Sequence, residues 1–583
     1  MTARTCGASS SSTDRAGSTD KAGTTRRYVL DRRVRRLGPA GRVLLGGEPF
    51  RLLRLSPAGV AVLDDLCGDD LCGDDLCGDD LCGDDLAGGE LSAGERSAGR
   101  SEGPAATALV ARLTAGGLLH PLPAARSAAV DEVTVVVPVR DDDRTVARLL
   151  AQLRAEFAGP VVVVDDGSAD DSSVRLHSVA AAAGAVLVRK SSPGGPASAR
   201  NAARTFVSSP LVAFLDADAV GEPGWLGKLL AHFEDGRLGA VAPRVRAVGH
   251  GRLAGYESVS SPLDLGPEPG LVGAHRRLSF VPTAALLCRA TALDDIGWFD
   301  DGLTVGEDVD LLRRLEAAGW RVRYEPRSVV RHDSRPDVVS FLRQRCRYGS
   351  SAAALERRHP GTVAPFEGNS WAVTAVLALI LPFGRLRYRV PLSLLATAVP
   401  ARALRSKLRQ VGVASAGADA VATLAIAELG NLAGIASALR RAWWPPALAA
   451  AGLVPGWRRP IAGALLAAEV AGHVPPWWGA RRVAAGAAPP AWGGSGEPAA
   501  GAAPPARGGS GEPATCSLAA ALGLGALDDL AYGAGLWAGC LRHRSLRAVL
   551  PRLGQRGVGP RDVGPLGVGR RGDSPSEAPS RSR

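Results

Sequence analysis

Two acidic motifs contain the residues of this 583-residue chain that are best suited to chemistry. Asp216-Ala-Asp218 directly follows the apolar run 211–215, and Gly306-Glu307-Asp308 comes later in the chain. A buried strand that ends in Asp-x-Asp places two carboxylates at the C-terminal edge of a sheet, where α/β proteins bind ligands. Paired carboxylates suit a hard cation such as Mg²⁺ or Mn²⁺, which in turn suits a diphosphate. A further carboxylate can act as a general base, so the motifs together indicate sugar transfer from a nucleotide-sugar donor.

Other polar residues follow neighbouring apolar runs. Pro138 and Arg140 lie at the end of one run, and Asp166 comes after the run 161–164. A carboxylate at such a strand end can accept hydrogen bonds from a uracil N–H or a ribose hydroxyl, although Asp-Gly turns also follow strands that bind nothing. Arg200 lies before a predicted helix, and its guanidinium could hold a base or a diphosphate through paired hydrogen bonds.

The segment from residue 133 to about 336 alternates apolar runs with helical patterns. The runs 133–138, 161–164, 185–188 and 211–215 are rich in Val and Leu, and helices are predicted between them. Continuous apolar strands separated by helices are typical of a parallel sheet that is covered on both faces. The sequence therefore predicts an α/β domain.

These motifs, in this order and spacing, resemble glycosyltransferase family 2, whose catalytic domain has the GT-A fold with a Rossmann-like, mostly parallel sheet. The resemblance covers residues 131–350 and includes the run from Gly297 to Leu311. It implies that Asp166 binds uracil, that Asp216 approaches the ribose and that Asp218 holds Mg²⁺ or Mn²⁺.

The same resemblance implies that Asp308 is the general base of an inverting, metal-dependent transferase, with Glu307 as the competing base. Asp308 begins a predicted helix, and a helix N-terminus favours an ionised carboxylate. Asp308 would then deprotonate the acceptor hydroxyl, which attacks the anomeric carbon from the face opposite the diphosphate. The cation would neutralise the charge of the leaving nucleoside diphosphate.

Four further residues are candidates for the metal and acceptor sites. Many family members have a histidine at the position of His332, and there it serves as a metal ligand. A lone histidine, however, is more often structural. Gln344-Arg345-Cys-Arg347-Tyr348 resembles the Gln-x-x-Arg-Trp motif of processive polysaccharide synthases, with Tyr in place of Trp, and it also fits a plain amphipathic helix. By the motif resemblance we expect Arg347 and Tyr348 to contact the acceptor. A further candidate for an acceptor platform is the aromatic ring of Trp298.

The full layout resembles the mycofactocin-system glycosyltransferases of actinobacteria. The runs 293–311 and 357–365 and the Ala-rich C-terminal part carry this resemblance. It implies transfer of β-linked glucose from UDP-glucose onto a peptide-derived redox cofactor or its precursor. The N-terminal part resembles a peptide-recognition domain. The alternatives are a cell-envelope rhamnosyl- or galactofuranosyltransferase and a catalytically dead, membrane-anchored binding module.

The composition limits the partners. The net charge of +11 comes mainly from arginine. Because the chain also has 72 Gly and only one Met, the many arginines point to a compositional bias. We therefore expect no nucleic-acid partner. Four of the nine cysteines lie in an Asp-Asp-Leu-Cys-Gly repeat and the others show no paired spacing, which favours a reduced, cytoplasmic setting. The repeat is expected to be an acidic disordered loop rather than a metal site, because zinc sites have other spacings.

The C-terminal third favours membrane association over the alternative of a soluble helical domain. Tryptophans next to arginines are typical of interfacial anchors, and several short or re-entrant spans are expected. The basic tail places the catalytic domain on the cytoplasmic side of the cell membrane. The expected parts are a disordered leader (1–27), a small N-terminal domain (28–123) with the repeat insertion (64–86), the transferase domain (131–350), a membrane-associated helical region (368–480), a repeat linker (486–514), a helical segment (516–540) and a disordered basic tail (541–583).

Overall fold

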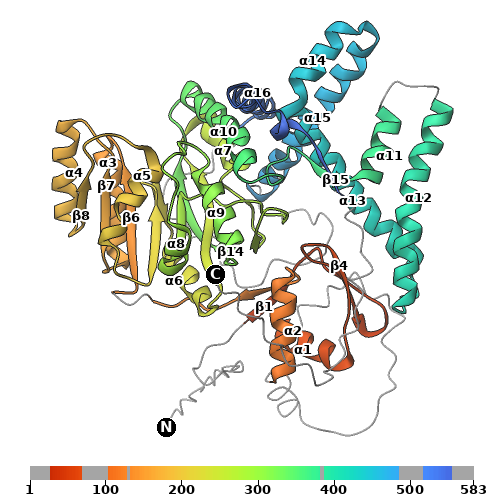
Figure 1. Cartoon of the computed structure of the whole chain (residues 1–583), viewed down its shortest axis with the longest axis horizontal. Helices are drawn as coiled ribbons and strands as arrows, with labels where there is room; N and C mark the ends of the chain where they lie inside the picture. The colour runs from red at the N-terminus through yellow and green to blue at the C-terminus, as the bar shows by residue number, and fades with distance from the viewer. Residues whose placement is uncertain (1–26, 68–102, 128–130, 381–385, 485–515, 555–583) are drawn as a thin grey trace, which may run out of the picture.

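The computed structural model describes residues 27–67, 103–127, 131–380, 386–484 and 516–554. The predicted leader, most of the acidic repeat, the repeat linker and the end of the basic tail lie outside the described residues. Figure 1 shows three parts: a small N-terminal unit, a central sheet with helices on both faces, and a group of C-terminal helices.

The N-terminal unit is a small sheet packed against two helices. Consecutive apolar residues form a hairpin, with β3 paired antiparallel to β4. Leu44, Leu53, Leu63 and Leu113 pack together in its core. The elements are β1 (Arg27–Leu30), β2 (Arg35–Leu37), β3 (Val43–Gly46), β4 (Arg51–Arg54), α1 (Pro57–Cys67), α2 (Pro104–Ala115) and β5 (Leu119–Leu122), with β1 and β5 paired. That this unit recognises a peptide stays a prediction.

A nine-stranded sheet forms the centre, in the order β10-β14-β11-β13-β9-β6-β7-β8, with β12 paired to β14. The first four strands along the chain, β6 to β9, are parallel, as predicted, and antiparallel partners enter in the second half. The strands are β6 (Val133–Val139), β7 (Val161–Asp165), β8 (Val186–Arg189), β9 (Leu211–Leu215), β10 (Ala219–Gly221), β11 (Leu238–Val248), β12 (Gly270–Val272), β13 (Ala285–Arg289) and β14 (Arg321–Asp333).

Helices cover both faces of this sheet, because its strands are apolar on both sides (Figure 1). One face packs against α3 (Asp143–Glu156), α4 (Asp170–Ala182) and α6 (Trp225–Leu230). The other face packs against α5 (Gly195–Ala202), α8 (Ala290–Ile296) and α9 (Glu307–Ala317). The predicted α/β fold is confirmed, and the acidic motifs lie at the ends of its elements.

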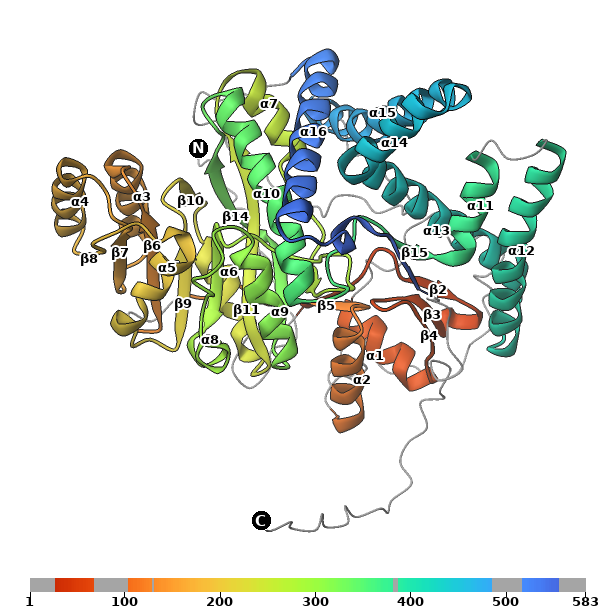
Figure 2. The same ribbon diagram turned by 45° about the horizontal axis from the view of Figure 1, so that its top comes forward.

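The C-terminal helices lie to one side of the sheet. Figures 1 and 2 show α11 to α15 projecting away from it, while α16 lies beside α10. The chain remains ordered beyond the boundary expected at residue 540, since β16 pairs with β15. Two helices of the central domain, α7 (Gly251–Ser260) and α10 (Val338–Arg358), contact α16. The C-terminal elements are β15 (Glu367–Asn369), α11 (Ser370–Ile380), α12 (Leu386–Gln410), α13 (Ala416–Ala438), α14 (Trp444–Leu453), α15 (Arg458–Ala484), α16 (Leu518–Arg542) and β16 (Arg552–Gly554).

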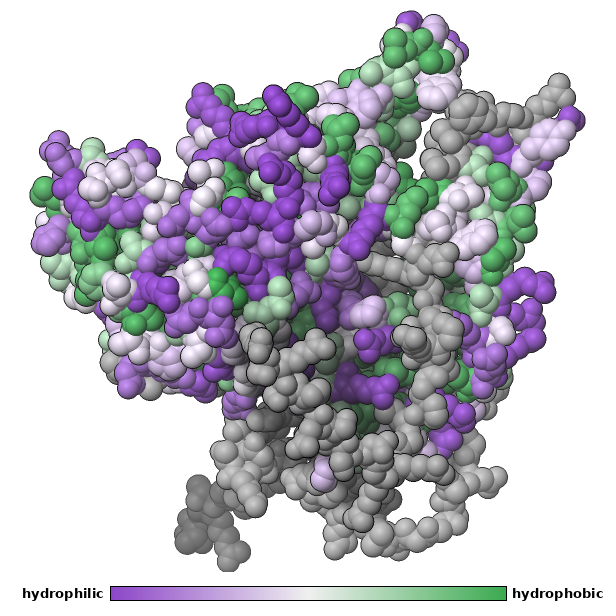
Figure 3. All heavy atoms as spheres, viewed as in Figure 1, coloured by the Kyte–Doolittle hydropathy of each residue, from purple (hydrophilic) through white to green (hydrophobic). Residues whose placement is uncertain are grey.

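One helical stretch among the described residues, Ala416–Leu453, is long and apolar enough to cross a membrane. It comprises α13, a π-helical turn at Leu439–Trp443 and α14. Its side chains are largely outside the core: Val421, Ile426 and Leu429 are each at least 60% exposed. Figure 3 shows apolar residues gathered over the projecting helices.

Candidate active site

Strand pairing brings the first acidic motif to His332. Asp216 and Asp218 follow β9, and the short strand β10 then pairs antiparallel with β14, so that Ala219 lies opposite His332. In this register the His332 Nε2 atom lies 3.2 Å from Asp218 Oδ1. The main chain is fixed on both sides, because Asp216 N donates to Ala284 O and Asp333 N donates to Asp218 O.

A group of three residues fits a divalent cation. It consists of Asp216, Asp218 and His332 and is called the metal-type cluster below. One ligand atom from each residue lies within 4.8 Å of the others. Carboxylate oxygens with an imidazole nitrogen are ligands that Mn²⁺ accepts, and Mg²⁺ binds carboxylates together with phosphates. The His332 ring is oriented by a contact of 3.1 Å between its Nδ1 atom and Asp333 O. Burial alone would lower the pKa of His332, but the hydrogen bond to Asp218 and the nearby carboxylate charges outweigh burial and raise it.

Arg200 joins the two acidic motifs. It lies on α5, is only 2% exposed and donates to Asp216 Oδ1 at 2.7 Å and to Glu307 Oε1 at 3.1 Å. Its guanidinium also lies 5.3 Å from the ring centroid of Phe299. Both of its terminal nitrogens are engaged with carboxylates inside the protein, and its contact with the base or the diphosphate stays a prediction.

Asp308 and Glu307 have different surroundings at the start of α9. Gly306 takes the left-handed conformation (φ 84°) before the helix, and a side chain there would press against Ser351 and Leu355 of α10. Glu307 is paired with Arg200, whereas the Asp308 Oδ1 atom accepts from the adjacent Val309 N at 2.8 Å. Burial and the charge of Glu307 raise the pKa of Asp308 to about 7. The sequence suggested that the helix N-terminus keeps this carboxyl ionised and strongly acidic. In the structure, burial and Glu307 outweigh the helix N-terminus.

The next carboxylate of the motif, Asp310, has a structural role that the sequence analysis missed. It is 1% exposed and lies 2.8 Å from His359 Nε2. Arg314 Nε, one turn later on α9, donates to its other oxygen at 2.7 Å. Asp310 thus ties α9 to the end of α10, and the Asp-x-x-x-Arg spacing on one helix face was the available signal.

Asp166 lies after β7, as predicted, but its carboxylate is held by the protein. Its two oxygens accept from Lys190 Nζ at 2.5 Å, from Gly194 N at 2.9 Å and from Gly195 N at 2.7 Å. Lys190 is one of four lysines in the chain and was not singled out from the sequence. Asp166 therefore shapes the glycine turn before α5, and its contact with uracil stays a prediction.

The remaining donor candidates lie at the end of β6. Pro138 pairs with Val164 within the sheet, and the Arg140 side chain is 56% exposed, with its Nε atom 3.6 Å from Asp141 Oδ2. Asp141 has a positive φ of 55°, and it accepts from Ala169 N at 2.8 Å. These residues lie at the C-terminal end of β6, an interior strand of the sheet, and their contact with the donor stays a prediction.

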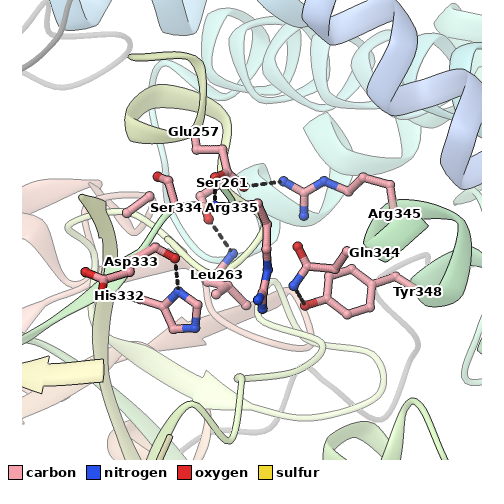
Figure 4. A pocket seen from close by; sticks show the side chains of 11 residues that line it. Glu257, Ser261, Leu263, His332, Asp333, Ser334, Arg335, Gln344, Arg345 and Tyr348 are labelled. Atoms are coloured by element: carbon pink, nitrogen blue, oxygen red, sulfur yellow. Dashed lines mark hydrogen bonds and ion pairs between the residues drawn. The ribbon is translucent and has the colours of Figure 1, made fainter. Parts of the chain in front are cut away.

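A small pocket adjoins the metal-type cluster (Figure 4). Its lining includes His332, Arg335, Gln344 and Tyr348, and the Gln344 amide lies 2.8 Å from the Tyr348 hydroxyl. Arg335 Nη2 lies 3.9 Å from Asp218 Oδ2 on the metal side of the pocket. Burial raises the pKa of Tyr348 to about 12, so its hydroxyl stays protonated and can bind a sugar.

Two of the predicted acceptor residues do not lie in this pocket. Trp298 is 2% exposed and packs edge-to-face on Phe214, while its Nε1 atom donates to Asp294 Oδ1 at 2.9 Å. The expectation that Trp298 is an acceptor platform is therefore wrong, since its ring belongs to the core. Arg347 lies on an exposed face of α10, and Arg345 lines the pocket instead.

The sequence matches known glycosyl transferases. A model of "Glycosyl transferase family 2" matches residues 134–287, and a model of "Glycosyl transferase family group 2" matches residues 211–416. The chain is 36% identical over 536 residues to the pre-mycofactocin glycosyltransferase of Mycobacterium tuberculosis, which covers 90% of this chain and 97% of that protein. It is 33% identical over 206 residues to the succinoglycan biosynthesis protein ExoU of Rhizobium meliloti, over 34% of this chain and 60% of that protein.

Among solved structures, similarity is found to the mannosyltransferase PcManGT from Pyrobaculum calidifontis in complex with GDP-Man and Mn²⁺. The identity is 18% and the TM-score is 0.32, over 61% of this chain and 89% of that one. GalNAc-T7 with UDP, GalNAc and Mn²⁺ is also similar, at 14% identity and a TM-score of 0.30, over 46% of this chain and 54% of that one.

Proposed function

Because this chain belongs to the pre-mycofactocin glycosyltransferases, within glycosyl transferase family 2, we propose that it transfers glucose from UDP-glucose onto pre-mycofactocin with inversion at the anomeric carbon. Similarity along nearly the whole chain supports the acceptor class, since it includes the regions outside the catalytic domain. The geometry of the two acidic motifs supports the reaction type.

The cation expected in this reaction is Mg²⁺ or Mn²⁺, with Asp216, Asp218 and His332 as its protein ligands. When bound, such a cation neutralises the negative charge that develops on the leaving diphosphate. Arg200 holds Asp216 in place by a buried hydrogen bond of 2.7 Å and so keeps its carboxylate oriented toward the other ligands.

Asp308 is the proposed general base. Its carboxylate accepts the proton of the acceptor hydroxyl as that oxygen bonds to the anomeric carbon and the bond to the diphosphate breaks, releasing UDP. A base works best when its pKa lies near the working pH, and the value of about 7 for Asp308 meets this condition. Glu307 is the weaker candidate, because its carboxylate is paired with Arg200.

The carrying observation is that Arg200 pairs with Asp216 of the metal-type cluster at 2.7 Å and with Glu307, the neighbour of the proposed base, at 3.1 Å. Incubation of the purified protein with Mn²⁺, UDP-glucose and pre-mycofactocin should add one or more hexose masses to the acceptor. NMR of the product should show a β-linked sugar. No added hexose with UDP-glucose, together with transfer from dTDP-rhamnose, would overturn the proposal.

The helical region supports a second part of the proposal, namely attachment to the cytoplasmic face of the cell membrane. The stretch Ala416–Leu453 is long and apolar enough to span a bilayer and exposes most of its apolar side chains. In fractionated cells the protein should remain with membranes after a high-salt wash and be released by detergent. Release by salt alone would contradict insertion.

A further inference from the structure

A buried chain of charged residues runs from α16 to the active-site pocket. Asp528 of α16 is 5% exposed, and its Oδ1 atom lies 3.1 Å from Arg345 Nε on α10. Arg345 in turn donates to Glu257 Oε1 of α7 at 3.2 Å (Figure 4). The second oxygen of Glu257 accepts from the main-chain N of Arg335 at 3.3 Å. Arg335 lies three residues after His332, so the side chains of Asp528, Arg345 and Glu257 connect α16 with the main chain beside the pocket.

Close helix packing makes this connection stiff. α10 and α16 approach each other at Gly349 and Gly535, where a Cβ atom would collide with the main-chain oxygens of Tyr532 and Cys346 respectively. The approach is therefore possible only with glycine at both positions. Arg345 is 2% exposed and lies between Gln344 and Tyr348 in the sequence. Gln344 and Tyr348 line one side of the pocket, called the pocket wall below, so a shift of Arg345 would move this wall.

Further contacts fix the α16 end of this connection. The other oxygen of Asp528 accepts from the Tyr256 hydroxyl at 3.1 Å, which fixes the carboxylate in the plane that faces Arg345. The next residue, Asp529, turns the opposite way and pairs with Arg441 Nε at 3.2 Å and with His473 Nε2 at 3.1 Å. A buried charge that loses its partner is costly, so the arrangement of α7, α10 and α16 is tightly coupled.

From this geometry we infer that Asp528 is a positioning residue for the acceptor side of the active site. It acts through Arg345, which it holds against Glu257 so that Gln344 and Tyr348 face the pocket. This inference rests on the proposed function, and it takes the pocket as the acceptor side because Tyr348, a predicted acceptor residue, lines it next to His332. It makes α16, which follows the transferase domain by more than a hundred residues, a working part of the catalytic unit.

The test compares Asp528→Asn with Asp529→Asn, which removes the neighbouring buried charge on the side away from the pocket. In full-length enzyme with Mn²⁺, UDP-glucose and pre-mycofactocin, Asp528→Asn should raise the KM for the acceptor about tenfold while the KM for UDP-glucose changes little. Asp529→Asn should lower thermal stability without moving either KM. Arg345→Lys keeps the charge but shortens the reach, and it should reproduce the effect of Asp528→Asn.

Equal acceptor KM values for wild type, Asp528→Asn and Arg345→Lys would overturn the inference. Hydrogen exchange of the same proteins separates this failure from a failure of the proposed function. Asp528→Asn should increase exchange in residues 344–350 and 334–336, and Asp529→Asn should not. If wild type transfers no sugar, the proposed function fails while the exchange result still decides whether Asp528 controls the pocket wall.

Discussion

Asp216 and Glu307, which belong to different motifs, both accept hydrogen bonds from the guanidinium of Arg200, at 2.7 and 3.1 Å. The arginine is almost completely buried, so the pairing is fixed rather than a surface contact. Asp216 belongs with Asp218 and His332 to the metal-type cluster, and Glu307 is the neighbour of Asp308. The proposed metal site and the proposed base are therefore both connected to Arg200.

Replacement of Arg200 by Met should abolish transfer and destabilise the fold, because two buried carboxylates lose their partner. Breaking a buried ion pair of this kind costs about 3–5 kcal/mol. Thermal unfolding and initial rates measure the two effects. Arg204→Met is the matched control, since Arg204 is exposed and pairs with Asp294 on the surface. Similar losses in both variants would argue against the support role of Arg200.

Asp308→Asn should lower kcat by about 10²–10⁴-fold, the usual contribution of a general base. The variant should stay folded and should still bind UDP in the presence of Mn²⁺, because Asp308 is not in the metal-type cluster. Equilibrium binding of UDP and initial rates check both statements. Wild-type turnover by Asp308→Asn would refute the base assignment and turn attention to Glu307.

The pH dependence of kcat/KM should report the pKa of Asp308, which is about 7. The base works only when deprotonated, so the rate should fall about tenfold per unit below pH 7 and level off above it. A plateau that extends down to pH 5 would be inconsistent with this assignment.

The same pKa has a consequence for stability. A carboxyl whose pKa is raised on folding favours the folded state below its unfolded pKa of 3.8, and this contribution is lost as the pH rises through about 7. Asp308→Asn should therefore melt at a higher temperature than wild type at pH 8, and the difference should vanish toward pH 4. An equal melting difference at both pH values would mean that the carboxyl is not perturbed.

Metal removal should stop transfer reversibly. Chelation by EDTA should abolish activity, and added Mn²⁺ should restore it, because Asp216, Asp218 and His332 are the proposed ligands. His332→Gln should need a higher Mn²⁺ concentration for half-maximal rate, and Asp218→Asn should not recover at all. Full activity after exhaustive chelation would rule out a metal-dependent mechanism.

Trp298 should behave as a core residue. Trp298→Ala should cost about 3–5 kcal/mol of stability, as large-to-small changes of buried aromatic residues do. Trp298→Phe keeps much of the packing on Phe214 and should leave the KM for the acceptor unchanged. A selective rise of that KM in Trp298→Phe would restore the acceptor role expected from the sequence.

The sequence carried the α/β pattern and the placing of the acidic motifs, because strand periodicity and strand-end carboxylates are local signals. It also led to His332, whose contact with Asp218 depends only on the antiparallel register of β10 and β14. The roles of Arg200 and Trp298 depend on contacts between distant segments. An arginine after a glycine turn and a tryptophan in a loop look the same whether they face a ligand or the core.

The raised pKa of Asp308 was hidden for a related reason. The helix N-terminus is visible in the sequence, whereas burial and the orientation of Glu307 depend on how α9 meets α5 and α10. The link from α16 to the pocket was equally hidden, since Asp528 and Arg345 are far apart in the sequence.

Transfer of a labelled sugar tests the central claim most directly. Wild type and Asp308→Asn would be incubated with Mn²⁺, UDP-[¹³C]glucose and pre-mycofactocin. The mass of the acceptor would be followed over time by mass spectrometry. The account predicts labelled hexose on the acceptor with wild type and almost none with Asp308→Asn at equal UDP binding. Labelling at the same rate with both proteins, or none with wild type, would contradict it.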